Sequence, residues 1–514
     1  MTRLSSTLAV SLLAATLAHA GPPIGEDGAR HLLARTGFGP TAAEIARYAP
    51  LDRESAVARV LASPRSIPVT VPPAALTDDA PIGAPPDGAT NEERRAYIRE
   101  QVRLGLEMRG WWMREMLATE SPLAERMTLF WHNHFVSSQQ KVRSAKLMYR
   151  QNATLRRYAL GDFGALLHAA SKDAAMLLYL DGVRNRRGAP NENFAREVME
   201  LFTLGEGHYN ERDVKEAARA FSGWSLERGT GTFVFRRAMH DPGEKTILGR
   251  TGRFDGDAVL DILLERPETA ELIVAKLWRE FVSPDPDEAN VRRIAADFRR
   301  SGYRTPVALS KLLNSDAFWS QDNRGVLVKS PIELVVGTLR SLEVAPDDAV
   351  PFALAAAGMG QNLFSPPNVK GWRGGEAWID SSTLLARKQF VESISRYEES
   401  RTMRAMTASP ALPASRALLT PAPPIGTDAN ADEDARARQL RIARALDRAF
   451  RELAFSATRF IASMPGDTPA AKRRNAQTVL LPIAPAGSGA SIPQDADALA
   501  FVRLTMLDPV YQLK

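Results

Sequence analysis

Apolar residues recur at three- and four-residue steps through most of this chain, and helix-capping residues stand at the ends of these stretches. Residues spaced in this way share one face of an α-helix, which must bury its apolar stripe against other helices. Stretches with this pattern include Asn91–Thr119, Asp257–Glu265, Glu268–Val282, Glu288–Arg299, Thr305–Asn314 and Pro331–Leu342. Ser121 and Pro122 add a cap and a first-turn proline at a further start.

Strand patterning is confined mainly to one short region. Between Phe233 and Leu248, β-branched and aromatic residues flank the turn residues Asp241, Pro242 and Gly243. This combination predicts a small β-hairpin. The sequence therefore predicts an all-α protein, a large multi-helical domain with a minor β-hairpin.

The first twenty residues have the order of a secretory signal peptide. Arg3 is followed by an apolar run from Leu8 to Leu17 and by Ala18-His19-Ala20. A charged start, a short apolar core and small residues at the cleavage positions predict removal of residues 1–20. We expect a secreted or periplasmic protein that begins at Gly21. Elsewhere the sequence has no run of eighteen apolar residues, so we expect no membrane span after cleavage.

The remaining chain divides by composition. Residues 21–400 are expected to form the main helical domain, with a proline-rich loop at 64–89 and a loop rich in glycine and tryptophan at 358–380. Residues 401–514 are expected to be a helical C-terminal part of the same domain, which contains a mobile linker at 409–431. A long helix is predicted over Glu433–Ser463, because apolar residues recur there at helical spacing.

Charge and cysteine content exclude several classes of function. The chain has 66 basic and 60 acidic residues, a formal net charge of +6, with both signs interspersed. It has no dense basic stripe of the kind that follows phosphates, so nucleic acid is not expected as a partner. The absence of cysteine excludes disulfides, thiolate nucleophiles and zinc-thiolate sites. A divalent metal would have to use His, Asp or Glu.

One predicted helix concentrates polar side chains on a single face. At helical spacing, five polar residues fall within an arc of roughly 140°, and apolar residues fill the other side. This polar arc can be a solvated face with Glu192 and Arg196 paired, or a buried face that meets other polar groups at a site. We expect the buried arrangement, with the arc directed at the segment Phe130–Phe135. The arc consists of Glu192, Asn193, Arg196, Glu197 and Glu200.

Histidines supply the other candidates for acid–base chemistry or metal binding. His132 and His134 lie in the sequence WHNHF. If a helix runs through this motif, the two rings point about 200° apart and cannot share a metal, whereas an extended chain would place both on one side. One ring could also be a core residue and the other a helix-end residue. His240 stands beside Asp241, which could orient its ring or belong to a turn.

The loop at 358–380 is a candidate binding surface. Indole faces with nearby amides could stack on and hydrogen-bond a sugar ring, and the alternative is that the tryptophans fill the core beneath the loop. The side chains that would contact a glycan are Gln361, Asn368 and Trp372. The sequence has no HExxH, GxSxG or phosphate-binding GxxxxGK[ST] motif.

Several long motifs occur in a recognisable order. They are HLLARTGFGP from His31, FWHNHF from Phe130, PNENFARE from Pro190, HDPGEKTILG from His240, KSPIELVVGTLR from Lys329 and MGQNLFSPPNVKGW from Met359. In this order the chain resembles the bacterial domain of unknown function family 1800, from about His31 to the final LDPVYQLK, with a diverged portion at about 401–495. The resemblance implies exported, mostly helical proteins without an established activity. It also implies a companion, since members are often encoded beside a secreted, sulfatase-like family of unknown function, number 1501.

Two classes of function follow as hypotheses. The first is a hydrolase or metal-assisted enzyme whose catalytic residues are drawn from Glu192, Glu197, Glu200, His132 and His240, with His132 and His134 as metal ligands and Asn193 and Arg196 as binding residues. The second is a non-catalytic binding or assembly protein that acts with the companion family, on cell-envelope polysaccharide. A motif set that converges on one concave site would favour the first class, and a dispersed set under the core would favour the second.

Overall fold

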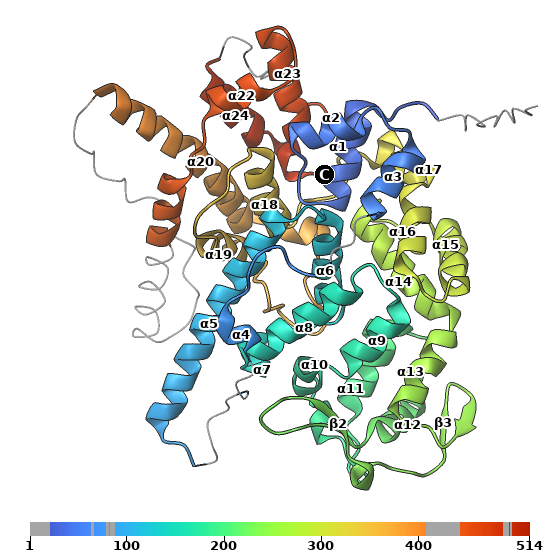
Figure 1. The fold of residues 1–514 in the computed structure, drawn as a ribbon. Coiled ribbons are helices and arrows are strands. Elements are labelled where there is room, and N and C mark those ends of the chain that lie inside the picture. Colours follow the sequence, from blue (N-terminus) through green and yellow to red (C-terminus); the bar gives the residue numbers. More distant parts are fainter. Residues whose placement is uncertain are drawn as a thin grey trace, which may run out of the picture.

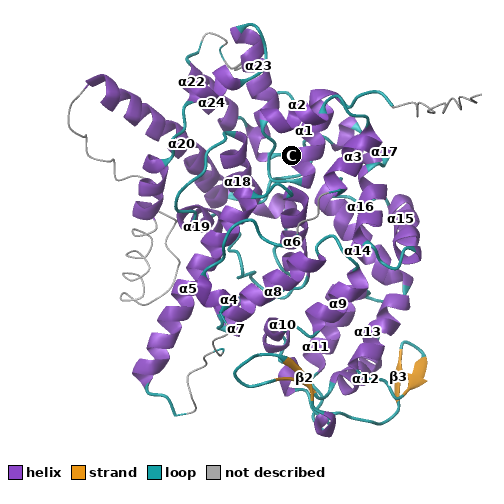
Figure 2. Ribbon diagram, viewed as in Figure 1, coloured by secondary structure: helices purple, strands orange, loops and turns teal. Residues whose placement is uncertain are grey.

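The structure is a computed structural model that describes residues 21–62, 66–78, 82, 88–407, 443–486, 493 and 496–514, with side chains left out at 400–407. The predicted signal peptide (1–20) and linker (409–431) and much of the proline-rich loop lie outside the described residues. The described part is helical almost throughout, which confirms the predicted all-α class (Figure 2).

Three short helices open the fold. Thr41 caps the second in a capping box with Glu44, and Asp52 caps the third by accepting from the Ser55 N–H at 2.8 Å. These side chains satisfy backbone donors that the first turn leaves free. The helices are α1 (Gly25–Thr36), α2 (Ala42–Tyr48) and α3 (Arg53–Leu61), followed by α4 (Ala74–Thr77).

The longest of the next helices, α5, runs diagonally to the centre of the molecule and leads into α6 (Figure 1). Thr90 starts α5 with a capping box, and Pro122 occupies the first turn of α6. Trp111, Trp112 and Trp131 from these two helices are fully buried. This layer comprises α5 (Asn91–Ala118), α6 (Pro122–His134), α7 (Gln139–Val142), α8 (Ala145–Tyr158), α9 (Phe163–Ser171) and α10 (Ala174–Tyr179).

A buried ion pair ties three of these helices together. Arg156 of α8 donates to Glu125 of α6 through Nε at 2.6 Å and Nη2 at 2.9 Å, and the Trp112 indole of α5 donates to the same carboxylate at 2.8 Å. The two charged side chains are 1% and 2% exposed. Charge-assisted and bidentate hydrogen bonds are stronger than neutral ones, so this pair fixes the first turn of α6 relative to α5 and α8.

The helix with the polar arc is α11 (Glu192–Glu197), and it continues as the π-helix η2 (Val198–Thr203). After α12 (Glu211–Phe221) come two separate antiparallel strand pairs, which replace the one hairpin that the sequence predicts. The pairs are β1 (Trp224–Leu226) with β2 (Phe233–Phe235), and β3 (Lys245–Ile247) with β4 (Arg250–Gly252). The turn at Asp241–Gly243 therefore connects two pairs and does not close a hairpin.

The second half of the domain is again helical, and α14 packs against α15. Its helices are α13 (Gly256–Glu265), α14 (Pro267–Phe281), α15 (Glu288–Arg300), α16 (Thr305–Leu313), α17 (Asp316–Trp319), α18 (Pro331–Ser341), α19 (Val350–Gly358) and α20 (Ser381–Thr407). Four 3-10 turns stand between elements, η1 (Gly182–Arg184), η3 (Arg237–Met239), η4 (Gln321–Asn323) and η5 (Gly375–Trp378).

The C-terminal part returns to the N-terminal helices, and α23 contacts both α1 and α2. The last residues lie beside α1 and α18 (Figure 1), where Leu513 pairs with Val328 in an isolated β-bridge. The long helix predicted at Glu433–Ser463 is wrong in its described portion, because residues 453–456 separate a helix at 443–452 from α22. The remaining elements are α22 (Ala457–Ser463), α23 (Pro469–Leu480), α24 (Ala498–Leu507) and η6 (Pro509–Gln512).

Within the described residues, we find no helix that combines the length and the apolar character needed to span a bilayer.

Candidate functional site

The helix α6 continues through the WHNHF motif to His134, so its two histidines face different parts of the core. His132 is 1% exposed, and its Nε2 accepts the Phe364 N–H at 3.2 Å. Phe364 has a φ of 60°, a left-handed conformation that is strained for a bulky residue. Burial lowers the pKa of His132 to about 3. His132 is thus a neutral imidazole that fixes the loop after α19.

The same motif fixes a second point of that loop. The Asn133 side chain accepts the Trp372 N–H at 2.7 Å and donates to the Trp372 carbonyl at 3.2 Å. Gly371 is required beside it, because a Cβ at that position would lie 2.3 Å from the Asn133 Oδ1 and φ is +77°. Two neighbouring residues of WHNHF therefore bind the backbone at both ends of the loop 364–372.

His134 instead contacts the π-helix η2. Its Nε2 donates to the Phe202 carbonyl at 3.2 Å, and its Nδ1 accepts from Lys276 of α14 at 3.0 Å. Lys276 also donates to the Leu201 carbonyl at 2.9 Å. A helix end leaves carbonyls without partners inside the helix, and these two side chains satisfy two of them at the end of the π turn. Burial, followed by the charge of Lys276, lowers the pKa of His134.

The contact between the WHNHF motif and the PNENFARE helix differs from the predicted site. WHNHF meets that helix through backbone carbonyls of the π turn and not through the polar arc. Because residues two apart on a helix point in nearly opposite directions, His132 and His134 cannot share one metal ion. Within the described residues, neither ring forms a hydrogen bond with a carboxylate of the arc.

The polar arc itself lies at the surface, contrary to the predicted inward orientation. Arg196 donates to Glu211 of α12 at 2.6 and 2.9 Å and lies 3.5 Å from Glu192. Asn193 is exposed, and its amide donates to the Leu180 carbonyl at 3.1 Å. The arc is partly solvated because the apolar side of α11, which includes Phe194 and Ala195, provides the buried face.

Two carboxylates of the arc do form a local cluster with another predicted segment. Glu200 accepts from the Tyr209 hydroxyl at 2.5 Å and lies 3.9 Å from the ammonium of Lys370, which belongs to the loop 358–380. Glu197 is partly buried and makes no hydrogen bond or ion pair with any described residue. Burial, and then the charge of Glu200, raises the pKa of Glu197. We call Glu197, Glu200, Tyr209 and Lys370 the carboxylate seam.

The loop 358–380 does not offer its tryptophans to a glycan. Trp372 is 5% exposed and Trp378 is 8% exposed, so both fill the core beneath the loop. Gln361 is buried as well, and its Oε1 accepts the Ile332 N–H at the start of α18 at 2.9 Å. Asn368 is exposed but accepts the N–H of Lys370 at 2.9 Å in a local turn. The predicted stacking surface is therefore wrong for Trp372 and Gln361.

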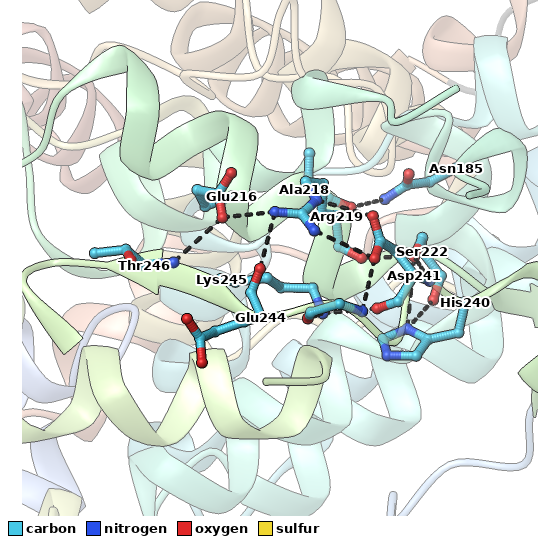
Figure 3. A network of polar contacts seen from close by, with 11 residues as sticks. Asn185, Glu216, Ala218, Arg219, Ser222, His240, Asp241, Glu244, Lys245 and Thr246 are labelled. Carbon is cyan, nitrogen blue, oxygen red and sulfur yellow. Dashed lines mark hydrogen bonds and ion pairs between the residues drawn. The ribbon is translucent and has the colours of Figure 1, made fainter. Parts of the chain in front are cut away.

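His240 belongs to a different set of contacts, a polar network around Arg219 (Figure 3). Its Nδ1 donates to the Ser222 carbonyl at 3.0 Å, and the Asp241 N–H donates to the Ser222 hydroxyl at 2.8 Å. Arg219 of α12 donates to Asp241 through Nε at 2.8 Å and Nη2 at 3.3 Å. Arg219 thereby lowers the pKa of Asp241 to about 2.

The rest of this network locks the turn between the two strand pairs. Lys245 is 1% exposed and donates to the carbonyls of Asp241 and Gly243 at 2.7 and 2.9 Å. Glu216 accepts from Arg219 and from the Thr246 N–H. No hydrogen bond or ion pair between described residues joins this network to His132 or to the arc, so the predicted catalytic set of arc, WHNHF and His240 is dispersed over three places.

Two carboxylates are the groups best placed to bind a divalent cation, Glu197 and Glu200 of the carboxylate seam. They would supply oxygen ligands, which suit Mg²⁺ or Ca²⁺, but such ions take about six or more ligands. Among the described residues, no group of three or more His, Cys, Asp or Glu side chains has the arrangement of a metal site.

The sequence reasoning missed three groups that the fold makes important. From helical periodicity, Lys276 and Arg219 would be interpreted as surface charges. No local pattern predicts that they bind groups from other segments. The third group is a set of buried cations from α1, α18 and the C-terminus, which line a cavity. The local sequence gives no signal for Arg30, because α1 also carries the charged residues Glu26, Asp27 and Arg35.

Comparison with known proteins adds a family and no activity. The family model described as protein of unknown function (DUF1800) matches residues 31–513. No curated protein and no solved structure matches the chain significantly. The match covers nearly all of the chain, including every motif described above. The chain therefore belongs to the DUF1800 family.

Proposed function

We propose that this chain is an exported, non-catalytic binding or assembly protein that acts with a companion exported protein of the family of unknown function 1501. The alternative of a histidine-based or metal-assisted hydrolase is less well supported. The motif histidines are engaged elsewhere, since His31, His132 and His134 are 2%, 1% and 4% exposed and each holds a backbone group. Their role is to fix loops and helix ends.

The observation that carries the proposal is the carboxylate seam. Glu197 lies partly exposed without a partner among the described residues, beside Glu200, whose partners come from two other segments. Glu206 adds a third carboxylate, 3.3 Å from Lys370. The seam therefore has more negative than positive charge, and a partner that presents a cationic side chain would complement it.

Binding between the purified mature chain and the companion protein tests the proposal, with calorimetry as the readout. We expect Glu197→Lys to weaken binding by about tenfold or more, since placing like charges opposite each other costs several kcal/mol. Lys388→Glu is the matched control, because Lys388 is exposed on α20 and makes no hydrogen bond or ion pair with another described residue. Equal affinities of wild type, Glu197→Lys and Lys388→Glu would rule out the seam as the contact surface.

One observation favours a second candidate, a carboxylate hydrolase of cell-envelope polysaccharide. The raised pKa of Glu197 beside the hydrogen-bonded Glu200 is the kind of asymmetry that separates a general acid from a base. If this candidate is right, isolated polysaccharide releases sugars, and both Glu197→Gln and Glu200→Gln abolish release, with or without added Mg²⁺. Unchanged polysaccharide after long incubation with wild type would leave only the binding role.

Export is part of the same proposal and has its own test. Intact-mass measurement on the protein recovered outside the cytoplasm should give a chain that begins at Gly21. A chain that retains residues 1–20 would contradict the predicted cleavage.

A further inference from the structure

Four segments far apart in the sequence line a small cavity near the C-terminal end of the chain. They are α1 with the residues after it, α18 with Lys329 before it, the end of α23, and the last residues of the chain. Figure 1 shows α1, α18, α23 and the C-terminus in one region of the fold. The cavity has a volume of about 20 Å³ for the centres of water-sized groups. A space above about 10–15 Å³ on this measure holds a water molecule, so this cavity has room for a water molecule or a compact inorganic ion.

The charges that line this cavity are unbalanced. Arg30, Lys329 and Lys514 have the cationic side chains of the lining, and Glu333 has its only acidic side chain. Glu333 already has partners, since it lies 2.5 Å from Arg126, receives a hydrogen bond from Lys514, and accepts the Ser330 N–H at 2.7 Å. Its charge is therefore neutralised by Arg126 and Lys514.

Arg30 is the side chain that most clearly lacks a partner. It is 3% exposed, and it makes no hydrogen bond or ion pair with any described residue. Arg35 on the same helix shows the contrast, because its guanidinium donates to the carbonyls of Phe281, Val282 and Asn323. Burial, followed by the charge of Arg324, lowers the pKa of Arg30 to about 9, and the charge of Asp27 opposes this shift. A buried guanidinium without hydrogen bonds is costly unless another group satisfies it.

Lys329 adds a second cation with spare capacity. Its ammonium donates to the Tyr511 carbonyl at 2.8 Å and lies 4.2 Å from the centre of the Tyr511 ring. An ammonium has three donors, so one hydrogen bond leaves others for a ligand. Burial lowers the pKa of Lys329 to about 7, and the nearby charge of Arg30 contributes. The two cations therefore destabilise each other unless negative charge lies between them.

The remaining polar groups of the lining are engaged within the protein. The Tyr511 hydroxyl shares a hydrogen bond of 2.7 Å with Thr338, and the Ser341 hydroxyl donates to the Pro40 carbonyl at 3.0 Å. The groups left to contact a ligand are cationic donors from separate segments. Donors that approach from several sides match the distributed oxygens of a tetrahedral oxyanion better than a planar carboxylate.

We propose that the cavity between α1, α18 and the C-terminal residues binds a tetrahedral oxyanion, a phosphate or a sulfate, through Arg30 and Lys329 with Lys514 behind them. The anion is either free inorganic phosphate or sulfate, or the corresponding group of a sugar ester that enters the cavity. This site is separate from the carboxylate seam and does not depend on the function proposed for it.

Calorimetry and thermal unfolding of the full mature chain test the proposal, at constant ionic strength with chloride as the balancing ion. Sodium phosphate and sodium sulfate are the probes, and sodium acetate is the planar comparison. We expect phosphate or sulfate to bind and to raise the melting temperature, and acetate to do so much less. Arg30→Met and Lys329→Met should each weaken oxyanion binding by about tenfold or more, the loss expected for a charge-assisted hydrogen bond.

A structural role for these residues gives a different result. If Arg30 only packs, Arg30→Met lowers the melting temperature and leaves the response to phosphate intact. If Arg30 binds an anion instead, Arg30→Met in chloride buffer should melt at the wild-type temperature or above, because the substitution removes an unpaired buried charge. Lys388→Met is the exposed control, and Lys329→Met carries the test if Arg30→Met does not fold.

Competition by a sugar phosphate or a sugar sulfate distinguishes the two sources of the anion. If either ester displaces the inorganic ion, the ligand is a substituted one, and if neither does, the ligand is the free ion. The proposal is overturned if wild type binds neither phosphate nor sulfate at millimolar concentration, or if Arg30→Met and Lys329→Met bind them as wild type does.

Discussion

The buried pair Glu125–Arg156 supports a quantitative prediction about what anchors the WHNHF helix. Glu125→Gln keeps the shape of the side chain but leaves the Arg156 guanidinium buried without its counter-charge. Breaking a buried pair from one side typically costs about 3–5 kcal/mol. We expect that loss in the free energy of unfolding, measured by denaturant titration with tryptophan fluorescence and circular dichroism.

A double replacement separates charge burial from packing. In Glu125→Met/Arg156→Met both charges are gone, so the desolvation penalty disappears together with the attraction. The Trp112 indole N–H then loses the acceptor that it has at 2.8 Å, which costs about 1–3 kcal/mol for an unpaired buried donor. We therefore expect the double variant to be more stable than Glu125→Gln alone.

The exposed pair Arg53–Asp316 is the matched control for that experiment. Its N–O distance of 2.7 Å resembles that of the buried pair, but the Asp316 side chain is 98% exposed. Asp316→Asn should change stability by no more than about 1 kcal/mol, as surface ion pairs generally do. The reasoning is refuted if Glu125→Gln is no worse than Asp316→Asn, or if the double variant is less stable than Glu125→Gln.

Two further predictions concern the loop and the polar network. Gly371→Ala should cost more than Gly375→Ala, although both residues have positive φ, because a Cβ at Gly371 meets the Asn133 side chain and a Cβ at Gly375 meets nothing within 4 Å. Comparing their melting temperatures isolates that contact, and equal losses would show that backbone strain, about 1–2 kcal/mol at either site, explains both. Asp241→Asn should destabilise by about 2–3 kcal/mol at neutral pH, since the hydrogen bonds from Arg219 lower the pKa of Asp241 in the folded protein to about 2, below the ordinary value of 3.8 for an aspartate. A carboxyl group whose pKa is lower in the folded state stabilises the fold above its unfolded pKa, and this stabilisation is lost as pH falls through about 2. The difference in unfolding free energy between Asp241→Asn and wild type should therefore shrink below about pH 4. A difference that stays constant across that range would contradict the assignment.

Much of the helical layout follows from local sequence. Thr41, Asp52 and Pro122 stand where the structure starts helices, because caps and first-turn prolines act on backbone groups only a few residues away. The strand region was located correctly but paired wrongly. Phe233–Phe235 pairs back to Trp224–Leu226, which places one partner strand before the predicted region. Strand pairing depends on which segments meet, so local patterning does not determine it.

The candidate site was less accessible to sequence reasoning. The spacing of the polar arc was consistent with a buried and with an exposed orientation. The arc lies at the surface because the apolar residues on the other side of α11 are buried. The loop tryptophans had two interpretations as well, and burial of Trp372 beneath its own loop excluded stacking on a sugar. The carboxylate seam needed Lys370, which lies far along the chain from Glu200. No pattern in either segment predicts that the two meet.

The sequence by itself determined the family, the helical class and the kinds of ligand chemistry that lack of cysteine excludes, because composition, period and capping are local properties. Only the tertiary structure decided which polar residues hold the fold together and which remain available to bind a ligand. His134 looks like a metal ligand in sequence and becomes a donor to the Phe202 carbonyl once η2 is placed against it. Arg30 looks like an ordinary surface charge and becomes a buried cation once the C-terminal residues cover it. The physical reason is that the protonation and hydrogen bonding of a side chain depend on the groups packed around it, and here those groups come from distant parts of the chain.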